Sequence, residues 1–514
     1  MKNLIRPLAL STFLGVGGIL GTDLLLAQEK TTRSDPPAKA LPADPPARGI
    51  GSAPGLPGRG AGNVNNGNPT DESKGDPNVS PVKVNDTIVK TDFAVKPKEL
   101  SETIKKGLKY LIDNQQNDGG WNQGGGWRDA GGGRGGRVEG DKVEDPSDVG
   151  NTCFVLLAML RAGNTVADGE YKDAVKKGLK FVISTVEKSK ADSLYVTDVR
   201  NTQLQGKIGQ YVDTFLVNLT LAEFRGKAGD QEKQLMAALE KTMTKIVKHQ
   251  TADGGFAGNN GWAPTLSVGI ANKSIARAKE RGAVVDEVVL KRALAQSQAA
   301  ATGTAPAAVA ASAPATGATS ATTPASTSGR LAGTAGDAGV ALYRVGQGAG
   351  NTQDLVNSLR PEAEKAKQVI KDEKATKEEK DQAQKKLDDF KKADGENDKN
   401  QENLGKSIRS DRFVSGFGNN GGEEFLSFMN ISESLVLKGG KDWEDWDAKM
   451  AKGLEKAQDS QGSWSGQHCI TGKTFCTAGA LLVLMADRTP FPVDIIKCAR
   501  EKKDNVNTKP TPEK

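Results

Sequence analysis

The sequence predicts an all-α protein in which six helical hairpins form a closed α6/α6 toroid. Two observations predict it: two kinds of helical pattern alternate along the chain, and one short motif recurs at long intervals. One kind of helix is amphipathic, and the other is apolar on nearly every side, so it must be buried on every side. An inner ring of buried helices inside an outer ring of amphipathic ones meets this need, because an open array would leave apolar faces exposed at its two ends.

The first amphipathic pattern places Leu100, Ile104 and Leu108 on one helical face, and the first buried pattern is the run CFVLLAMLRAG from Cys153. The later helices alternate in the same way. The amphipathic members are expected at 100–116, 170–187, 231–249, 286–298, 352–392 and 445–459. The buried members are expected at 148–162, 207–225, 264–281, 332–346, 423–437 and 472–487.

A glutamine–glycine–aromatic motif ends three of the amphipathic patterns. Its first copy closes the stretch GLKYLIDNQQNDGGW at Trp121, the second closes KIVKHQTADGGF at Phe256, and the third closes GLEKAQDSQGSW at Trp464. The two intervals between the copies are nearly equal when two inserted segments, 299–330 and 361–406, are left out. A nearly constant interval indicates an internal repeat.

This motif resembles the repeat of the terpenoid cyclase/protein prenyltransferase superfamily, the prenyltransferase and squalene oxidase repeat. The resemblance covers about 95–500 and implies the α/α toroid. It also implies a structural motif: glutamine bonds the carbonyls at a helix end, glycine makes the left-handed turn, and the aromatic ring packs between hairpins. The motif residues are Gln115 or Gln116 with Gly119, Gly120 and Trp121; Gln250 with Gly254, Gly255 and Phe256; and Gln458 or Gln461 with Gly462 and Trp464.

The catalytic motifs that this resemblance implies are not found in the sequence. A cyclase that works by protonation needs an Asp-x-Asp-Asp acid, and the nearest string, EDPSDVGNT, supplies only Asp145 and Asp148. Asp148 stands where a buried helix should begin, so we expect it to cap that helix, with a role as a cavity acid as the alternative. The zinc ligands of a protein prenyltransferase and the thioester string of complement-type toroids have no counterpart either.

Four polar residues near the starts of the buried patterns are candidate catalytic groups: Asp148, Tyr211, Asp213 and Glu423. Two carboxylates that face each other across a cavity would suit glycoside hydrolysis. Acids at helix N-termini are more commonly there because they interact favourably with the helix dipole.

Candidate ligand-binding residues come from two other stretches. The glycine-rich segment GGGWRDAGGGRGGR, 124–137, is too loose for a phosphate loop and predicts a flexible lip over the mouth of the ring. Trp127 and Arg128 could meet a ligand there, and Trp262 is a further candidate.

The four cysteines favour disulfides over a metal site. His468, Cys469 and Cys476 are the only close group of His and Cys, but zinc requires tighter spacing and a fourth ligand. In an exported protein disulfides are the better interpretation, with three possible connectivities. Closure of the ring would bring Cys153 near Cys476 or Cys498, so a disulfide could form there. The alternative to disulfides is that the thiols are free and buried.

The N-terminus predicts export. Lys2 and Arg6 precede an apolar stretch, and Ala27 offers a small residue for cleavage, so 1–27 is expected to be a secretory signal peptide. An uncleaved membrane anchor is the alternative, and no other segment is apolar enough to cross a bilayer.

The remaining boundaries follow from composition. A disordered linker is expected over 28–94, the toroid over 95–500, and a disordered tail over 501–514. Inside the toroid, 299–330 is Ala/Thr/Ser/Pro low complexity, and 361–406 is expected to be a solvated, charged helix that frays near its end.

Charge and composition limit the function. Seventy basic residues are interleaved with 64 acidic ones and form no basic cluster, which argues against nucleic-acid binding. The sequence favours an exported binding or scaffold module for a small molecule, peptide or glycan, without a cofactor. One alternative is an enzyme acting on an isoprenoid or lipid, although the buried patterns have few aromatic rings to stabilise a carbocation. A carbohydrate-active toroid is the second alternative.

Overall fold

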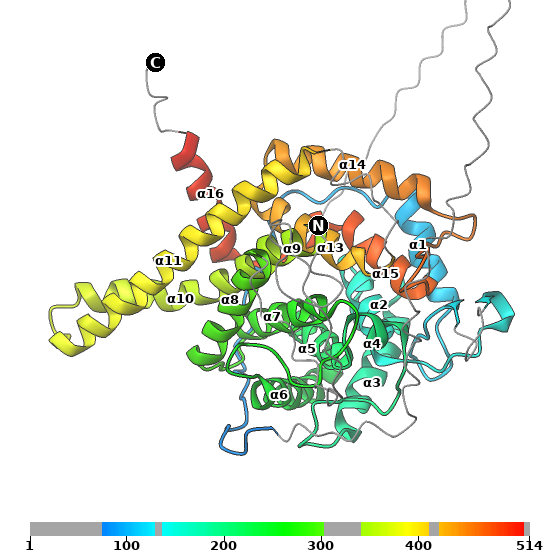
Figure 1. The fold of residues 1–514 in the computed structure, drawn as a ribbon, viewed down its shortest axis with the longest axis horizontal. Coiled ribbons are helices and arrows are strands. Elements are labelled where there is room, and N and C mark those ends of the chain that lie inside the picture. The colour runs from blue at the N-terminus through cyan, green and yellow to red at the C-terminus, as the bar shows by residue number, and fades with distance from the viewer. Residues whose placement is uncertain (1–74, 129–135, 303–340, 411–420, 508–514) are drawn as a thin grey trace, which may run out of the picture. The chain divides into compact units, whose positions relative to one another are not determined.

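The computed structural model describes residues 75–128, 136–302, 341–410 and 421–507, and Figure 1 shows their fold. The prediction of a mainly helical protein is confirmed, since helices dominate these ranges and strands are few. The predicted signal peptide, the linker up to 74 and most of the low-complexity insert lie outside the described residues.

The helices fall into the two predicted kinds. Every residue of α2 (Val149–Arg161) is buried, whereas only four residues of α1 (Glu102–Asp113) are buried, all on one face. The other buried helices are α5 (Val212–Phe224), α7 (Pro264–Glu280), α13 (Glu424–Lys438) and α15 (Lys473–Leu484). The other amphipathic helices are α3 (Lys172–Lys188), α6 (Glu232–His249), α8 (Glu287–Thr302) and α14 (Lys441–Ala457). The remaining helices belong to neither list: α4 (Gln203–Ile208), α9 (Ala341–Gly346), α10 (Thr352–Lys371), α11 (Lys377–Ile408) and α16 (Val493–Asn507).

The buried helices contact one another in chain order. Helix α2 packs on α5, α5 on α7, and α7 on α10 and on the π-helical turn η3 (Gln347–Asn351). Turn η3 packs on α13, α13 on α15, and α15 returns to α2. Amphipathic helices cover this series, with α3 on α2, α6 on α5, α8 on α7, α14 on both α13 and α15, and α1 on α15.

The fourth and fifth hairpins differ from the prediction. The segment 352–392 was expected to be one amphipathic helix, but 347–358 is entirely buried and continues the inner series. The buried pattern was missed because Gln353, Asp354 and Asn357 make this stretch look solvated, although each of these side chains is buried.

The charged insert forms a helical hairpin. Helices α10 and α11 lie side by side and extend away from the other helices, in the yellow part of Figure 1. The predicted fraying is wrong, because α11 runs unbroken to Ile408. Its later turns pack on η3 and α14 and bury Leu404 and Ile408, which stabilises a sequence that is otherwise highly charged.

The repeat motif joins each outer helix end to the next outer helix. Gln115 Nε2 donates to Gly119 O at 2.8 Å within its own turn, and to Ala174 O on α3 at 2.9 Å. The Trp121 indole donates back to Leu111 O at 2.6 Å. The Gln115 side chain therefore bridges the turn that follows α1 to the neighbouring helix α3.

The third copy repeats this geometry between α14 and α1. Gln458 Nε2 donates to Gly462 O and to Thr103 O, both at 2.9 Å, and the Trp464 indole donates to Leu454 O at 2.9 Å. The end of α14 is thereby joined to the start of α1.

The structure decides between the alternative glutamines. Gln116 donates to Asn114 O beside it, and Gln461 accepts from Lys473, so neither joins two outer helices. In the second copy the contact is longer: Gln250 Nε2 lies 3.4 Å from Val289 O.

The motif glycines are required by the close approach of the next helix. Gly119, Gly254 and Gly462 have φ of 90°, 82° and 86°, in the left-handed region. A β-carbon on any of them would collide with a backbone carbonyl of the neighbouring helix. Gly120 and Gly255 follow without a left-handed φ and lead into Trp121 and Phe256.

The segment before the first helix is not a disordered linker throughout. Residues 75–94 lie on the helical part, where Val82 and Val84 are buried. Strand β1 (Thr91–Phe93) pairs antiparallel with β4 (Pro490–Pro492), and Val84 bridges to Ala283. Likewise, α16 carries regular structure past 500, where a disordered tail was expected.

The C-terminal halves of α2, α5, α7 and α13 meet the first turn of α10 in a buried ionic network. Glu433 of α13 accepts from Arg161 of α2 at 2.7 Å and from Lys273 of α7 at 2.6 Å, and Arg277 lies 3.1 Å from Asp354 of α10. The cations lower the pKa of Glu433 to about 2 against the opposing effect of burial. The members, each at most 9% exposed, are Arg161, Glu223, Lys273, Arg277, Glu280, Arg281, Asp354 and Glu433.

Replacing Gln458 with Ala should lower the free energy of unfolding by about 1–2 kcal/mol, because its two hydrogen bonds to carbonyls are lost. Gln461→Ala is the matched control and should change it by less than about 0.5 kcal/mol. Urea unfolding followed by circular dichroism measures both. Equal effects of the two variants would contradict the assigned role of Gln458.

Replacing Glu433 with Gln should lower the free energy of unfolding by about 3–5 kcal/mol, because three buried cations lose their shared partner. Asp445→Asn, which removes the exposed pair with Lys441, should cost less than about 1 kcal/mol. Since the pKa of Glu433 lies below its unfolded value of 4.5, its contribution is present above pH 4.5 and is lost as the pH falls toward 2. A wild-type stability that does not fall in this window would contradict the network.

Candidate functional site

A cluster of reactive side chains forms where the buried helices begin. Lys207 lies at the end of α4, Tyr343 on α9 and Glu423 directly before α13, while His468 and Cys469 lie in the loop before α15. We call these residues the Cys469 cluster. Four separate stretches of the chain therefore contribute to one place.

The thiol of Cys469 lies between a cation and an imidazole. Lys207 Nζ is 2.7 Å from Cys469 Sγ and 3.3 Å from Glu423 Oε1, so the ammonium touches both a sulfur and a carboxylate. His468 Nδ1 lies 2.9 Å from the same Sγ. Tyr343 donates its hydroxyl to Glu423 Oε1 at 3.3 Å, which orients the carboxylate.

The loop that carries Cys469 is held from two sides. Gln203 Oε1 on α4 accepts from the amides of Thr471 and Gly472 at 2.8 and 3.0 Å. On the other side Gly422 N donates to Ile470 O at 2.8 Å. Cys469 itself has a φ of 63°, a left-handed conformation that costs free energy for a residue with a side chain and often marks functional sites.

The cluster is buried on one side and open on the other. Glu423 and Tyr343 are completely buried and Lys207 is 7% exposed, whereas His468 and Cys469 are exposed. Among the described residues, the buried Glu423 Oε2 finds no hydrogen-bond partner. Partial burial and the nearby Glu423 raise the pKa of the Cys469 thiol, although Lys207 opposes this, so the protonated thiol is favoured at neutral pH.

The cluster also contains a possible metal-ligand set. One ligand atom each from Glu423, His468 and Cys469 lies within 4.8 Å of the other two. The sequence prediction of no metal site depended on the spacing of His and Cys alone, and Glu423 is too far away in sequence to have entered it. Nothing in the sequence pointed to Lys207 or Tyr343.

Two of the predicted ligand-binding residues lie beside this cluster. The Trp262 ring lies 3.4 Å from Lys207 Nζ and is 43% exposed, and Trp127 is 50% exposed. Trp127 N donates to Thr471 Oγ1 at 2.8 Å, in the same loop as Cys469. The predicted lip is partly regular here, because β2 (Gly126–Trp127) pairs with β3 (Arg137–Val138), while 129–135 lie outside the described residues. Arg128 forms an ion pair with Asp145.

The structure brings Asp148 and Asp213 together in a separate, buried pair. Asp148 caps α2, because its Oδ1 accepts from Asn151 N at 2.8 Å. Asp213 Oδ2 accepts from Gln205 Nε2 at 2.5 Å, while its buried Oδ1 has no hydrogen-bond partner in the described ranges. A β-carbon on Gly150 would collide with Asp213 Oδ1 and lie 3.6 Å from Asp148 Oδ1, so both carboxyl groups flank one point.

Burial and mutual repulsion keep this pair from ionising fully. Burial and the charge of Asp213 raise the pKa of Asp148 to about 8, and burial raises the pKa of Asp213 to about 6. Only 2% and 3% of these residues are exposed. The pair therefore joins the starts of α2 and α5, and it does not open toward a substrate.

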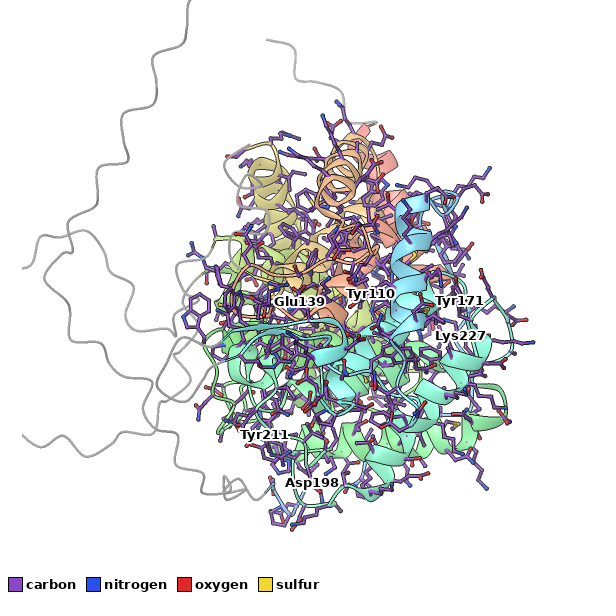
Figure 2. The ribbon with its side chains drawn as sticks, turned by 90° about the vertical axis from the view of Figure 1, so that its right-hand side faces the viewer. Tyr110, Glu139, Tyr171, Asp198, Tyr211 and Lys227 are labelled. Carbon is purple, nitrogen blue, oxygen red and sulfur yellow. The ribbon has the colours of Figure 1, made fainter. Side chains whose placement is uncertain are left out.

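Tyr211, the residue before α5, is buried and labelled in Figure 2. Its ring packs on Tyr195 with centroids 4.9 Å apart. It belongs to the packing around α5.

The four cysteines, all of which fall within the described ranges, are free. Cys153 and Cys476 are buried, Cys498 is half-buried and Cys469 is exposed. The proposed disulfide across the ring is therefore not formed, and the alternative of buried thiols applies to Cys153 and Cys476.

Comparisons with protein-family models, with curated proteins and with solved structures found no match to this chain. Among the described helices, none is long and apolar enough to cross a membrane.

Replacing Asp148 with Asn should remove part of the pH dependence of stability while keeping the helix cap, because Asn caps as well as Asp. The pKa of Asp148 is raised from 3.8 to about 8, so the folded state binds the extra proton and wild-type stability falls as the pH rises from about 4 to 8. We expect the Asp148→Asn variant to gain at least about 1 kcal/mol over wild type at pH 8 relative to pH 5.

Thermal unfolding measured at both pH values tests this expectation. Asp148→Ala, which lacks both the carboxyl and the cap, should be about 1 kcal/mol less stable than Asp148→Asn at either pH. If the stability of the wild type and that of the Asp148→Asn variant changed with pH in parallel, the acid pair would be ionised in the folded protein.

Proposed function

We propose that this chain is an exported ligand-binding module, built as a six-hairpin α/α toroid of the terpenoid cyclase/prenyltransferase type. Support for the toroid comes from the contacts of α15 with α2 and from the Gln458–Thr103 hydrogen bond between α14 and α1. Both contacts join the end of the helical series to its beginning. The predicted signal peptide is the basis for proposing export.

The observation that carries the binding function is the position of Trp127 and Trp262. Both rings are about half exposed, and both lie beside α4 and the loop of Cys469. The other four tryptophans of the chain are at most 7% exposed. Large apolar rings kept at the surface next to converging polar groups are typical of a ligand site.

The opposite ends of the buried helices favour no ligand. Their charged side chains are matched with one another in the ionic network. A ligand is therefore expected at the N-terminal ends, where Trp127 and Trp262 offer flat faces and Lys207 offers a charge. A small molecule, a peptide or a glycan with an apolar face and an acidic group fits this combination.

Two alternatives receive less support. A cyclase acting on an isoprenoid would need an acid that reaches its substrate, and Asp148 and Asp213 are buried and hydrogen-bonded. The same burial disfavours this pair as the two carboxylates of a glycosidase, which must flank the scissile bond.

The binding function can be tested with peptide and glycan arrays probed by the purified full chain. We expect a defined subset of acidic ligands to bind, and the Trp127→Ala/Trp262→Ala double variant to lose at least about tenfold in affinity, since aromatic anchors contribute about 1.4 kcal/mol or more.

The matched control is Phe93→Ala, which removes an aromatic ring that is 38% exposed on β1. It should bind like wild type. Ligands that bind equally to wild type and to the double variant would refute the proposed site.

A further inference from the structure

We infer that Glu423, His468 and Cys469 form a binding site for one divalent transition-metal ion, with zinc the best fit. This inference deepens the proposed binding function, and it rests on that proposal only in placing the metal at the same ligand entrance. It is carried by the positions of the three side chains and by the unsatisfied carboxylate oxygen among them.

The first argument is the identity of the three donors. A thiolate, an imidazole and a carboxylate are the ligand types of zinc sites, and three protein ligands with one open position are typical of sites where a further ligand binds. Sulfur and nitrogen donors disfavour magnesium and calcium, which take oxygen ligands. The set is therefore selective for a softer ion.

The second argument is geometric. The three ligand atoms lie within 4.8 Å of one another, whereas bond lengths of about 2.0–2.3 Å in a tetrahedron require separations of about 3.3–3.8 Å. Small side-chain rotations of the two exposed residues, His468 and Cys469, would close this difference. Cys469 is already held with a left-handed backbone that fixes its position against Glu423.

The third argument is that Glu423 is prepared as a ligand. Its residue is completely buried, and within the described part of the chain its Oε2 has no hydrogen-bond partner, which is costly for a buried carboxylate. Tyr343 donates to the other oxygen at 3.3 Å and so fixes its orientation. Metal-binding carboxylates commonly have such a supporting donor.

Lys207 explains how the site is neutralised without a metal. Its ammonium lies 2.7 Å from Cys469 Sγ and 3.3 Å from Glu423 Oε1, within the same ligand set. Two cations cannot share these ligands, so the metal must displace the ammonium, which can remain near the Trp262 ring 3.4 Å away. On binding, the Cys469 thiol loses its proton to solvent and bonds the ion as a thiolate.

Titration calorimetry of the reduced full chain with zinc chloride, and absorption spectroscopy with cobalt chloride, test the inference. We expect one ion per chain and a cobalt–thiolate charge-transfer band. Cys469→Ser and His468→Gln, both at exposed positions, should each weaken zinc binding about tenfold or more and alter the band. Lys207→Met should strengthen zinc binding, because the competing ammonium is removed.

Cys498→Ser is the matched control, since it removes another accessible thiol outside the cluster, and it should bind zinc like wild type. Circular dichroism of each variant establishes that it is folded. Absence of zinc binding in both wild type and Lys207→Met, or binding that survives both Cys469→Ser and His468→Gln, would overturn the inference.

The same measurement on Trp127→Ala/Trp262→Ala separates the two proposals. This double variant should still bind one zinc ion, because neither ring supplies a ligand. Loss of organic ligand with zinc retained supports both proposals. Array binding that fails while zinc binding succeeds would refute only the proposed organic ligand.

Discussion

The buried ionic network between the C-terminal halves of α2, α5, α7 and α13 and the first turn of α10 is the constraint on which the rest of the structure depends. Helices α2, α5, α7, α10 and α13 each contribute a charge to it, and none of these charges can be left unmatched away from water. Each of these helices is therefore fixed both in its position along its axis and in its rotation about that axis. Apolar packing alone would allow a helix to rotate or slide, whereas Arg277, between Glu433 and Asp354, does not.

The same helices carry different chemistry at their two ends. At one end opposite charges pair with each other, and at the other end Glu423, His468 and Cys469 converge and Cys469 adopts an unfavourable backbone conformation. Such local costs are tolerated where the surrounding structure is stable enough to enforce them. The ionic network at one end of the buried helices thus helps to stabilise the unfavourable backbone conformation of Cys469 at the other end.

Helix type could be predicted from the sequence because periodicity is local, and the pattern of α1 and α2 is complete within their own residues. The burial of 347–358 could not be predicted from the sequence, because its polar residues are buried against partners that are distant in sequence, such as Lys273. Which of Gln115 and Gln116 bonds to the next helix depends on the residue at which α1 ends. The sequence pattern does not fix that residue to within one position. The Cys469 cluster was found only in part, because its members come from four segments that only the fold brings together.

The pairing of β1 with β4 has a consequence for how the helical part could be rebuilt. Thr91 lies opposite Pro492, so the strand that leads into the first helix and the strand that follows the last buried helix are already neighbours. A short connection could join them, with new ends opened in another exposed loop, which would keep the contacts among α1 to α15 but remove those of α16 with α13 and those of the segment before β1. Such circular permutants are commonly tolerated when the termini of a domain are close.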